Sequence, residues 1–175
     1  MAQESHIFLS DGVKDEDLQR RVCGLRLCAY PPEINDWTLQ LECTVGSPIV
    51  FYMIPGEDAT TRNGRLLVTC RDGETVSHGL NSLQFPLLRL LLPVWLILKW
   101  IVAKGRDCYK FTEQGGGSRY WYHTFIMDLE LATLLAPGSA QLAQLFMSKF
   151  YDLEGNEVSD RPLENGLFYD LKALT

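Results

Sequence analysis

The sequence is short of basic residues. Of its 175 residues, 16 are lysine or arginine and 22 are aspartate or glutamate, so the formal net charge is −6. A surface that binds nucleic acid needs concentrated positive charge to neutralise phosphates, and the pairs Arg20/Arg21 and Arg62/Arg65 are too sparse to supply it. The composition therefore argues against nucleic acid as a partner.

Paired cysteines are also missing. The five cysteines are odd in number and contain no C-x-x-C pair, so neither a disulfide framework nor a zinc knuckle is indicated. The start of the chain shows no secretory signal pattern, and no Asn-x-Ser/Thr sequon occurs. We expect five free thiols, a reducing compartment and a cytoplasmic location.

Histidine is scarce as well. The only three are His6, His78 and His123, and no spacing gathers three metal ligands, so we expect neither metal nor cofactor. The glycine run before Ser118 is not a P-loop, because no Gly-Lys-Ser/Thr follows the glycines. His123 lies about 140° around a helix axis from Ser118, too far to act as its base.

No uninterrupted apolar run is long enough to cross a membrane. Residues 85–103, from Phe85 to Ala103, are almost wholly apolar, but Arg89, Lys99, Pro86 and Pro93 interrupt them. We expect a buried, kinked helix or a pair of short helices. Weak contact with a membrane surface and a homodimer interface stay open as alternatives.

The rest of the chain predicts an α+β fold in one domain, residues 1–175, with a mobile segment at residues 1–20. Residues 37–45 alternate between apolar and polar side chains, which is typical of a half-buried strand. Turn signals separate this run from other strand-like segments. The strands and the helical segments that follow them predict a small antiparallel sheet packed with about three helices. The expected strands are residues 22–30, 37–45, 49–54 and 65–70, with a short one at 167–171; the clearest helices are 118–135 and one that Ser139 caps.

A glycine-rich corner precedes the first of these helices in "FTEQGGGSRYWYH", residues 111–123. Glycines before a helix start expose backbone N–H groups and let a ligand approach closely, so the corner is suited to an anion, an oxyanion or a nucleophile. The alternative is a flexible loop in which Ser118 is simply the N-cap residue.

Two tryptophan-containing corners carry a family resemblance. "NDWTLQL" and "GRDCYKFTEQGGGSRYW", with "GRLLV" between them, resemble an uncharacterised fungal protein family. That family has His-Trp at the start of a central strand and Gly-Cys-Arg-Tyr/His-Trp at a later helix. Its pattern is in turn similar to circularly permuted papain-like thiol hydrolases of the lecithin–retinol acyltransferase type. The resemblance covers about residues 22–135 and implies a permuted papain-like arrangement.

Both catalytic positions of that pattern are substituted here. Asp36 stands where the histidine would be, before the matching Trp37, and Ser118 stands where the cysteine would be, before Arg119. A serine hydroxyl is a weak nucleophile without a base, and a carboxylate whose pKa is near 4 is a weak base for it. We therefore expect that thiol-hydrolase chemistry is lost.

The candidate site is the pocket that the resemblance would place at these corners. Asp36, Ser118 and Arg119 are the candidate catalytic residues, although Arg119 and Asp36 forming a structural ion pair is an alternative. The candidate binding residues share aromatic or glycine character, apart from one histidine, and would line an apolar pocket, although core packing is the alternative for the aromatics. They are Trp37, Tyr109, Gly116, Gly117, Tyr120, Trp121 and His123.

Three function classes follow. The first is an enzyme of natural-product biosynthesis that shapes a small apolar metabolite for cyclisation, cycloaddition, isomerisation or dehydration without covalent catalysis. The second is a non-enzymatic ligand-binding or interaction protein. The third is a residual serine hydrolase or acyltransferase that uses Ser118. Loss of both thiol-hydrolase positions favours the first two.

Overall fold

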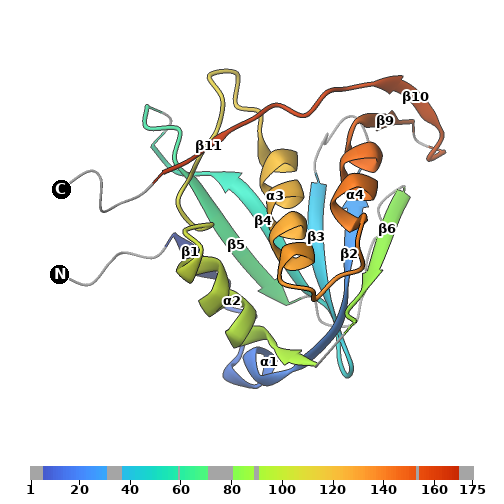
Figure 1. Cartoon of the computed structure of the whole chain (residues 1–175). Coiled ribbons are helices and arrows are strands. Elements are labelled where there is room, and N and C mark those ends of the chain that lie inside the picture. Colours follow the sequence, from blue (N-terminus) through green and yellow to red (C-terminus); the bar gives the residue numbers. More distant parts are fainter. Residues whose placement is uncertain are drawn as a thin grey trace.

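The computed structural model describes residues 6–30, 37–58, 60–70, 81–88, 91–152 and 154–169. It has an α+β fold, as the sequence predicts, built on one mixed seven-stranded sheet (Figure 1). The strand order is β1-β5-β4-β3-β2-β6, and β7 also pairs with β2. These strands are β1 (Ile7–Leu9), β2 (Arg21–Ala29), β3 (Trp37–Cys43), β4 (Ile49–Pro55), β5 (Gly64–Cys70), β6 (Asn81–Pro86) and β7 (Leu92–Pro93).

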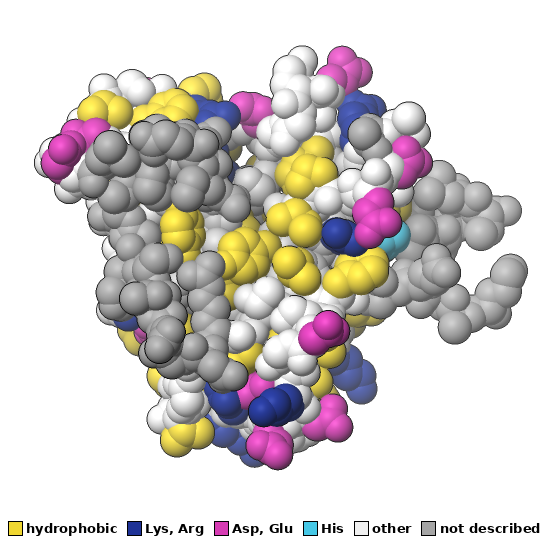
Figure 2. Space-filling model, turned by 180° about the vertical axis from the view of Figure 1, so that it is seen from behind, with side chains coloured by type: hydrophobic (Ala, Val, Ile, Leu, Met, Phe, Trp, Pro, Cys, Tyr) yellow, Lys and Arg dark blue, Asp and Glu magenta, His cyan; other side chains and the backbone are white. Residues whose placement is uncertain are grey.

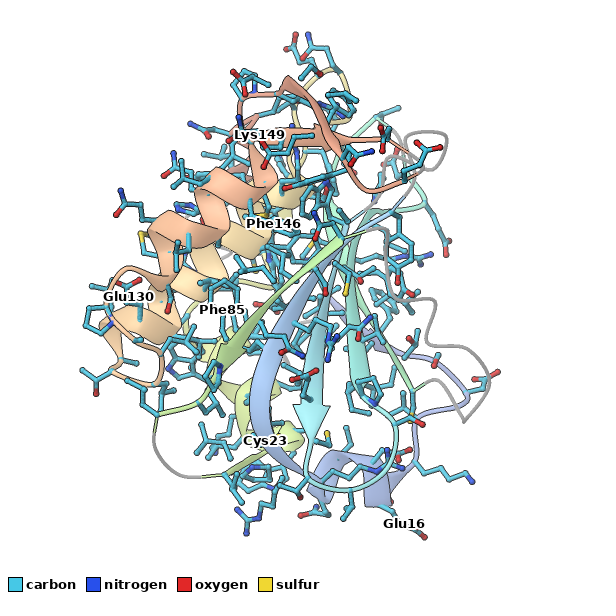
Figure 3. All side chains as sticks on the ribbon, turned by 90° about the vertical axis from the view of Figure 1, so that its right-hand side faces the viewer. Glu16, Cys23, Phe85, Glu130, Phe146 and Lys149 are labelled. Carbon is cyan, nitrogen blue, oxygen red and sulfur yellow. The ribbon has the colours of Figure 1, made fainter. Side chains whose placement is uncertain are left out.

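Helices and two small ribbons complete the described part of the chain. The helices are α1 (Asp15–Gln19), α2 (Val94–Ala103), α3 (Ser118–Leu131) and α4 (Ser139–Met147). One ribbon pairs β8 (Tyr109–Lys110) with β11 (Leu167–Phe168), and the other pairs β9 (Lys149–Tyr151) with β10 (Glu157–Asp160). Seen edge-on, α3 and α4 cover one face of the sheet (Figure 3).

Strand β3 is central, between β2 and β4, and both pairings are antiparallel. Trp37, Leu39 and Leu41 belong to the hydrophobic core on the helix side. The alternation correctly identifies the two faces, but Thr38 and Gln40 on the opposite face are also buried. The strand is therefore buried on both faces, and not on one face as predicted. The alternation of apolar and polar residues shows which residues share a face, but not whether other segments cover the polar face.

The core lies between the sheet and the helices. Phe125 of α3 stacks on Trp121 with 5.5 Å between ring centroids, and its ring lies 6.3 Å from that of Phe51 on β4. Ile97 and Ile101 of α2 are buried in the same cluster. Figure 2 shows the molecule from the side of the sheet away from the helices. In the visible part of this face, hydrophobic side chains lie in the middle and charged side chains lie toward the edges.

The apolar segment, residues 85–103, differs from the predicted helix. Its start belongs to strand β6, and α2 begins only after Pro93, which takes the N-cap position. Proline has no N–H to donate, so Pro86 is tolerated at the end of an edge strand and Pro93 before a helix. Within the described residues, no helix is long and apolar enough to cross a membrane.

Two other regions differ from the sequence expectation. The first described residues, within the segment expected to be mobile, form β1, which pairs in parallel with β5, and α1. A three-residue strand is too short to show an alternation. Helix α3 ends at Leu131 rather than near Leu135, and Thr133 takes a positive φ of 58° two residues later. Such a backbone conformation does not continue a helix.

Candidate functional site

A pocket of about 290 Å³ lies where α3 begins. Its lining comes from the start of β3, the glycine-rich loop, the first turn of α3 and the segment between β10 and β11. The lining residues are Trp37, Gln114, Gly115, Gly116, Gly117, Ser118, Arg119, Arg161 and Glu164. The structure thus brings five of the candidate residues together, namely Trp37, Gly116, Gly117, Ser118 and Arg119.

Other segments of the chain pack closely against two glycines of the loop. Gly117 has a φ of +125°, and an added Cβ would be 2.7 Å from the hydroxyl oxygen of Tyr109. At Gly116 an added Cβ would overlap the carboxylate of Glu164. Gly117 needs the absence of a side chain because of its φ and its neighbour, whereas a methyl at Gly116 would require the flexible Glu164 side chain to move. The glycine run is therefore a packed corner of the fold and not a flexible loop.

Ser118 is the first residue of α3, and Gly117 is the N-cap. The N-cap therefore lies one residue before the expected Ser118. The backbone at the N-cap has a positive φ of 125°, which glycine adopts more readily than serine. Among the described residues, the Ser118 side chain makes no hydrogen bond. No described base makes a hydrogen bond to its hydroxyl, which a serine nucleophile would need for activation.

Arg119 is buried, with 7% of its surface exposed. Its guanidinium donates to three backbone carbonyls, those of Met147, Arg161 at 3.2 Å and Pro162 at 3.0 Å. Burial, together with the neighbouring positive charge of Arg161, lowers the pKa of Arg119 to about 10, and Glu164 opposes this change. Arg119 thus ties α3 to the C-terminal segment. Asp36, its suggested partner, lies outside the described residues.

Three of the aromatic candidates, Tyr109, Tyr120 and Trp121, are absent from the pocket lining, whereas Trp37 belongs to it. Tyr109 is fully buried, donates from its hydroxyl to the carbonyl of Gly117 at 2.6 Å, and has a pKa raised by burial. Trp121 is fully buried and donates from Nε1 to the carbonyl of Arg106 at 2.6 Å. Tyr120 packs against Phe168, with 6.1 Å between ring centroids.

The described lining is therefore mostly polar, with Trp37 as its aromatic wall. The expectation of an apolar pocket fails here because helical spacing sends Trp121 into the core. His123 does not line the pocket either. It is half-buried, its Nδ1 is buried without a partner among the described residues, and burial lowers its pKa.

Sequence reasoning missed the contribution of the C-terminal segment. Arg161 and Glu164 enter the pocket from more than forty residues beyond Ser118, and neither belongs to a strand or helix with a readable period. A small cavity adjoins the pocket and shares Trp37, Arg119 and Arg161 with it. The hydroxyl of Tyr30, which lines that cavity, is buried and has no partner among the described residues.

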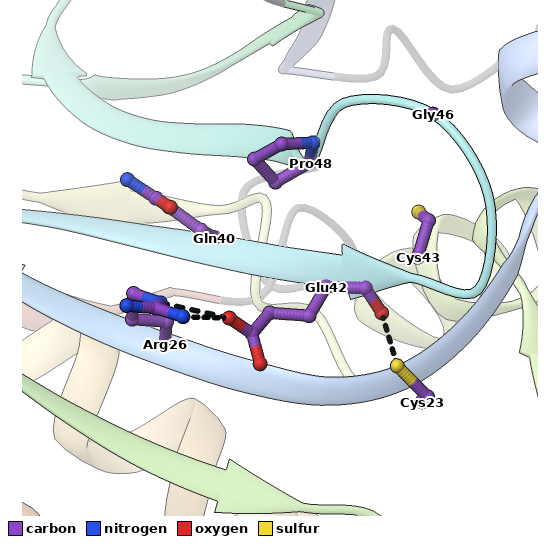
Figure 4. Close-up of a pocket in the computed structure, with 7 residues that line it drawn as sticks. All are labelled: Cys23, Arg26, Gln40, Glu42, Cys43, Gly46 and Pro48. Atoms are coloured by element: carbon purple, nitrogen blue, oxygen red, sulfur yellow. Dashed lines mark hydrogen bonds and ion pairs between the residues drawn. The ribbon is translucent and has the colours of Figure 1, made fainter. Parts of the chain in front are cut away.

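A second pocket, of about 320 Å³, lies at the ends of β2 and β3 beside the β3–β4 turn (Figure 4). There Arg26 donates from Nε to Glu42 at 2.7 Å, so the two charges satisfy each other, and the Cys23 thiol donates to the Glu42 carbonyl. Burial raises the pKa of the Cys43 thiol, which disfavours the reactive thiolate. In this pocket the charged side chains pair with each other, so we regard the pocket at α3 as the better candidate site.

No three of the described His, Cys, Asp and Glu side chains are arranged to hold a metal ion. The pocket at α3 is lined by three glycines, two arginines and one residue each with a carboxylate, a side-chain amide, a hydroxyl and an indole.

Comparison with protein families identifies a domain of unknown function, DUF7770, whose model matches residues 26–169. The chain belongs to this family. The matched region includes both corners of the pocket, from Trp37 to Glu164. No curated protein and no solved structure matches the chain.

Proposed function

We propose that this protein binds a small metabolite in the pocket at the start of α3 and acts on it without a covalent nucleophile. The observation that carries the proposal is the convergence of Trp37, the glycine corner, Ser118 and Arg119 on one cavity of about 290 Å³. Concave sites with a few convergent polar groups are the usual form of small-molecule sites.

The groups that line the pocket are suited to stabilising charge on a ligand and to restricting its conformation. The first-turn N–H groups of a helix have no partner within the helix and carry partial positive charge. Together with Arg119 they would polarise a carbonyl or stabilise developing negative charge, while Trp37 restricts the conformers of the ligand. Holding one reactive conformer contributes several kcal/mol without any nucleophile. Isomerisation, dehydration, cyclisation and cycloaddition in a natural-product pathway are reactions of this kind.

A binding protein without turnover is the second candidate. It is favoured by the position of Arg119, whose guanidinium is already held by three carbonyls. Such an arginine supplies charge and shape but does not exchange a proton near neutral pH, because its pKa of about 10 keeps it charged. A residual serine hydrolase has no comparable support among the described residues.

Two further proposals rest on the sequence. The relationship to permuted papain-like thiol hydrolases is supported by the meeting of Trp37 and Ser118 in one pocket. A reducing, cytoplasmic location is supported by five free cysteines, of which Cys28 and Cys108 are buried.

Amide NMR mapping of a fragment set tests the proposed function. The set should contain neutral, cationic and anionic single-ring compounds, added to ¹⁵N-labelled protein. We expect bound fragments to shift the amide signals of Gly116, Gly117 and Ser118. If every fragment leaves these signals unchanged, or if shifts gather only at the pocket beside Arg26 and Glu42, the proposal is wrong.

Two mass measurements separate the mechanisms. Incubation with a fluorophosphonate should leave the intact protein mass unchanged, because Ser118 has no described base; an adduct that disappears in Ser118→Ala would restore the serine hydrolase. Mass spectrometry of the recovered fragments then separates catalysis from binding. Converted fragments support the enzyme, and fragments that bind but return unchanged favour the binding protein.

A further inference from the structure

The C-terminal segment crosses the start of α3 and lines one side of the pocket. We name residues 161–166 the strap; in Figure 1 it lies in the red run between β10 and β11. Arg119 holds one end of the strap through the carbonyls of Arg161 and Pro162. At the other end Gly166 packs on Tyr109 so closely that an added Cβ would overlap the phenol.

The strap inserts a carboxylate into the glycine corner. Glu164 lies against Gly116, two residues before α3 begins, in the space that a Cβ at this glycine would need. The hydroxyl of Thr112 donates to its Oε2 at 3.4 Å, and Nη2 of Arg161 lies 3.6 Å from its Oε1. The corner therefore already accommodates a carboxylate that belongs to the chain itself.

These contacts are long, and the carboxylate is not enclosed. Its two polar contacts exceed the 2.7–2.9 Å typical of charge-assisted hydrogen bonds. The Glu164 side chain keeps 38% of its surface exposed. An anion that reached the same position from solution would compete with a weakly held group.

Within the described residues, two buried polar groups of the pocket and its adjoining cavity make no hydrogen bond to an anionic group. The described partners of Arg119 are neutral carbonyl oxygens, although this cation is buried. The hydroxyl of Tyr30 lines the adjoining cavity and makes no hydrogen bond within the described residues. A buried charge is stabilised when an opposite charge joins it, and a buried hydroxyl when an acceptor does.

We propose that the ligand of this pocket is a small molecule with an anionic group, a carboxylate or a phosphate, that replaces the carboxylate of Glu164 in the glycine corner. The strap is then a lid whose glutamate holds the anion position until the ligand enters. The volume of about 290 Å³ limits the ligand to roughly a single ring with its anionic group. This inference rests on the proposed function and specifies its ligand.

Charge-matched ligands test the inference. Benzoate, its neutral isostere benzamide, and phenyl phosphate are titrated into ¹⁵N-labelled protein while the signals of Gly116, Gly117 and the Arg119 side-chain Nε are followed. We expect benzoate or phenyl phosphate to bind at least tenfold more tightly than benzamide, and the tighter of the two identifies the anionic group. Equal binding of all three would overturn the inference.

A variant of the strap tests the role of Glu164. Glu164→Gln keeps the size of the side chain but removes the competing charge, so we expect the affinity for the preferred anion to rise three- to tenfold. Glu113→Gln is the matched control, since Glu113 lies in the adjacent loop with an 82% exposed side chain and does not line the pocket. An unchanged or weaker affinity in Glu164→Gln would show that the glutamate does not hold the anion position.

The two proposals fail in different ways. If neutral fragments shift the amides of Gly116 and Ser118 but neither anion does, the proposed binding site stands and the anionic ligand is wrong. If neither neutral nor anionic compounds shift these amides, the proposed function itself is wrong.

Discussion

The hydroxyl of Tyr122 on α3 donates a hydrogen bond to the carbonyl of Trp37 on β3, with 2.8 Å between the two oxygens. The same hydroxyl accepts the N–H of Met53 on β4 at 3.1 Å. All three residues are buried, so one side chain joins the helix to two neighbouring strands. Because Trp37 and the first turn of α3 both line the pocket, this contact helps to fix their relative position.

Removal of that hydroxyl should destabilise the protein. In Tyr122→Phe the N–H of Met53 stays buried without an acceptor, so the free energy of unfolding should fall by about 1–3 kcal/mol. Urea unfolding followed by circular dichroism measures the change. Tyr120→Phe is the control, because Tyr120 is half-buried and its hydroxyl makes no hydrogen bond among the described residues. Equal stability of the Tyr122 variant and the wild type would contradict this account of the α3 contact.

Glu130 at the end of α3 caps the start of α4. Its carboxylate accepts the N–H of Ala140 at 2.7 Å and that of Gly138 at 2.9 Å, and these bonds lower the pKa of Glu130. At neutral pH, Glu130→Gln should reduce the free energy of unfolding by about 1 kcal/mol, the usual effect of a lost cap. Urea unfolding at pH 7 measures it, and an unchanged midpoint would contradict the capping role.

The pH dependence of the free energy of unfolding, compared between wild type and Glu130→Gln, gives a second measurement of the same cap. The folded-state pKa of Glu130 is lower than its unfolded value, which is about 4.3. Its stabilisation is therefore present above that value and is lost as the pH falls through the folded-state pKa. The difference in stability between wild type and Glu130→Gln should shrink as the pH falls below about 4.3. A difference that grows in acid would have the wrong sign.

All five cysteines should react as thiols in the denatured, non-reduced protein. In the native protein we expect Cys23, which is exposed, to react with a thiol reagent before Cys28 and Cys108, which are buried. Mass spectrometry of the alkylated protein gives both results. Three or one alkylated cysteines after denaturation would mean that disulfides form and that the proposed reducing compartment is wrong.

Ser118→Ala should fold with nearly wild-type stability, within about 0.5 kcal/mol, because the serine neither caps α3 nor makes a described hydrogen bond. If the protein converts its ligand, the variant should lose at most roughly tenfold in rate, equivalent to about 1.4 kcal/mol. A loss of several orders of magnitude in a folded variant would identify Ser118 as a nucleophile. Urea unfolding and ligand turnover are the two measurements.

Local patterns in the sequence predicted much of the sheet and the position of the corner. The alternation around Leu39 and Leu41 identified the central strand, and the glycine run before Ser118 located the start of α3. Both signals are local, since strand period and helix entry depend on neighbouring residues. These local signals do not by themselves bring Trp37 and Ser118 together; the five pocket residues were selected through the family resemblance.

Long-range packing was not readable in the same way. Nothing near Glu164 indicates that its carboxylate lies on Gly116, and the sequence around Trp121 left open whether its ring faces the core or the pocket. The same limit explains why the segment from Phe85 to Ala103 was predicted as helix throughout. An apolar run is compatible with a strand or with a helix, and the prolines were the only local sign of a change between them. The polarity of the pocket depended on these long-range contacts.

The most direct test of the central claim is the affinity of Gly116→Ala for the tightest-binding fragment of the NMR set. The added methyl takes the space that the Glu164 carboxylate holds, and because this carboxylate ends a flexible side chain, the variant should still fold. Gly12→Ala is the control, since its Cβ would make only ordinary contacts. We predict at least tenfold weaker binding in Gly116→Ala and unchanged binding in Gly12→Ala. Wild-type affinity in Gly116→Ala would contradict a ligand site at the glycine corner.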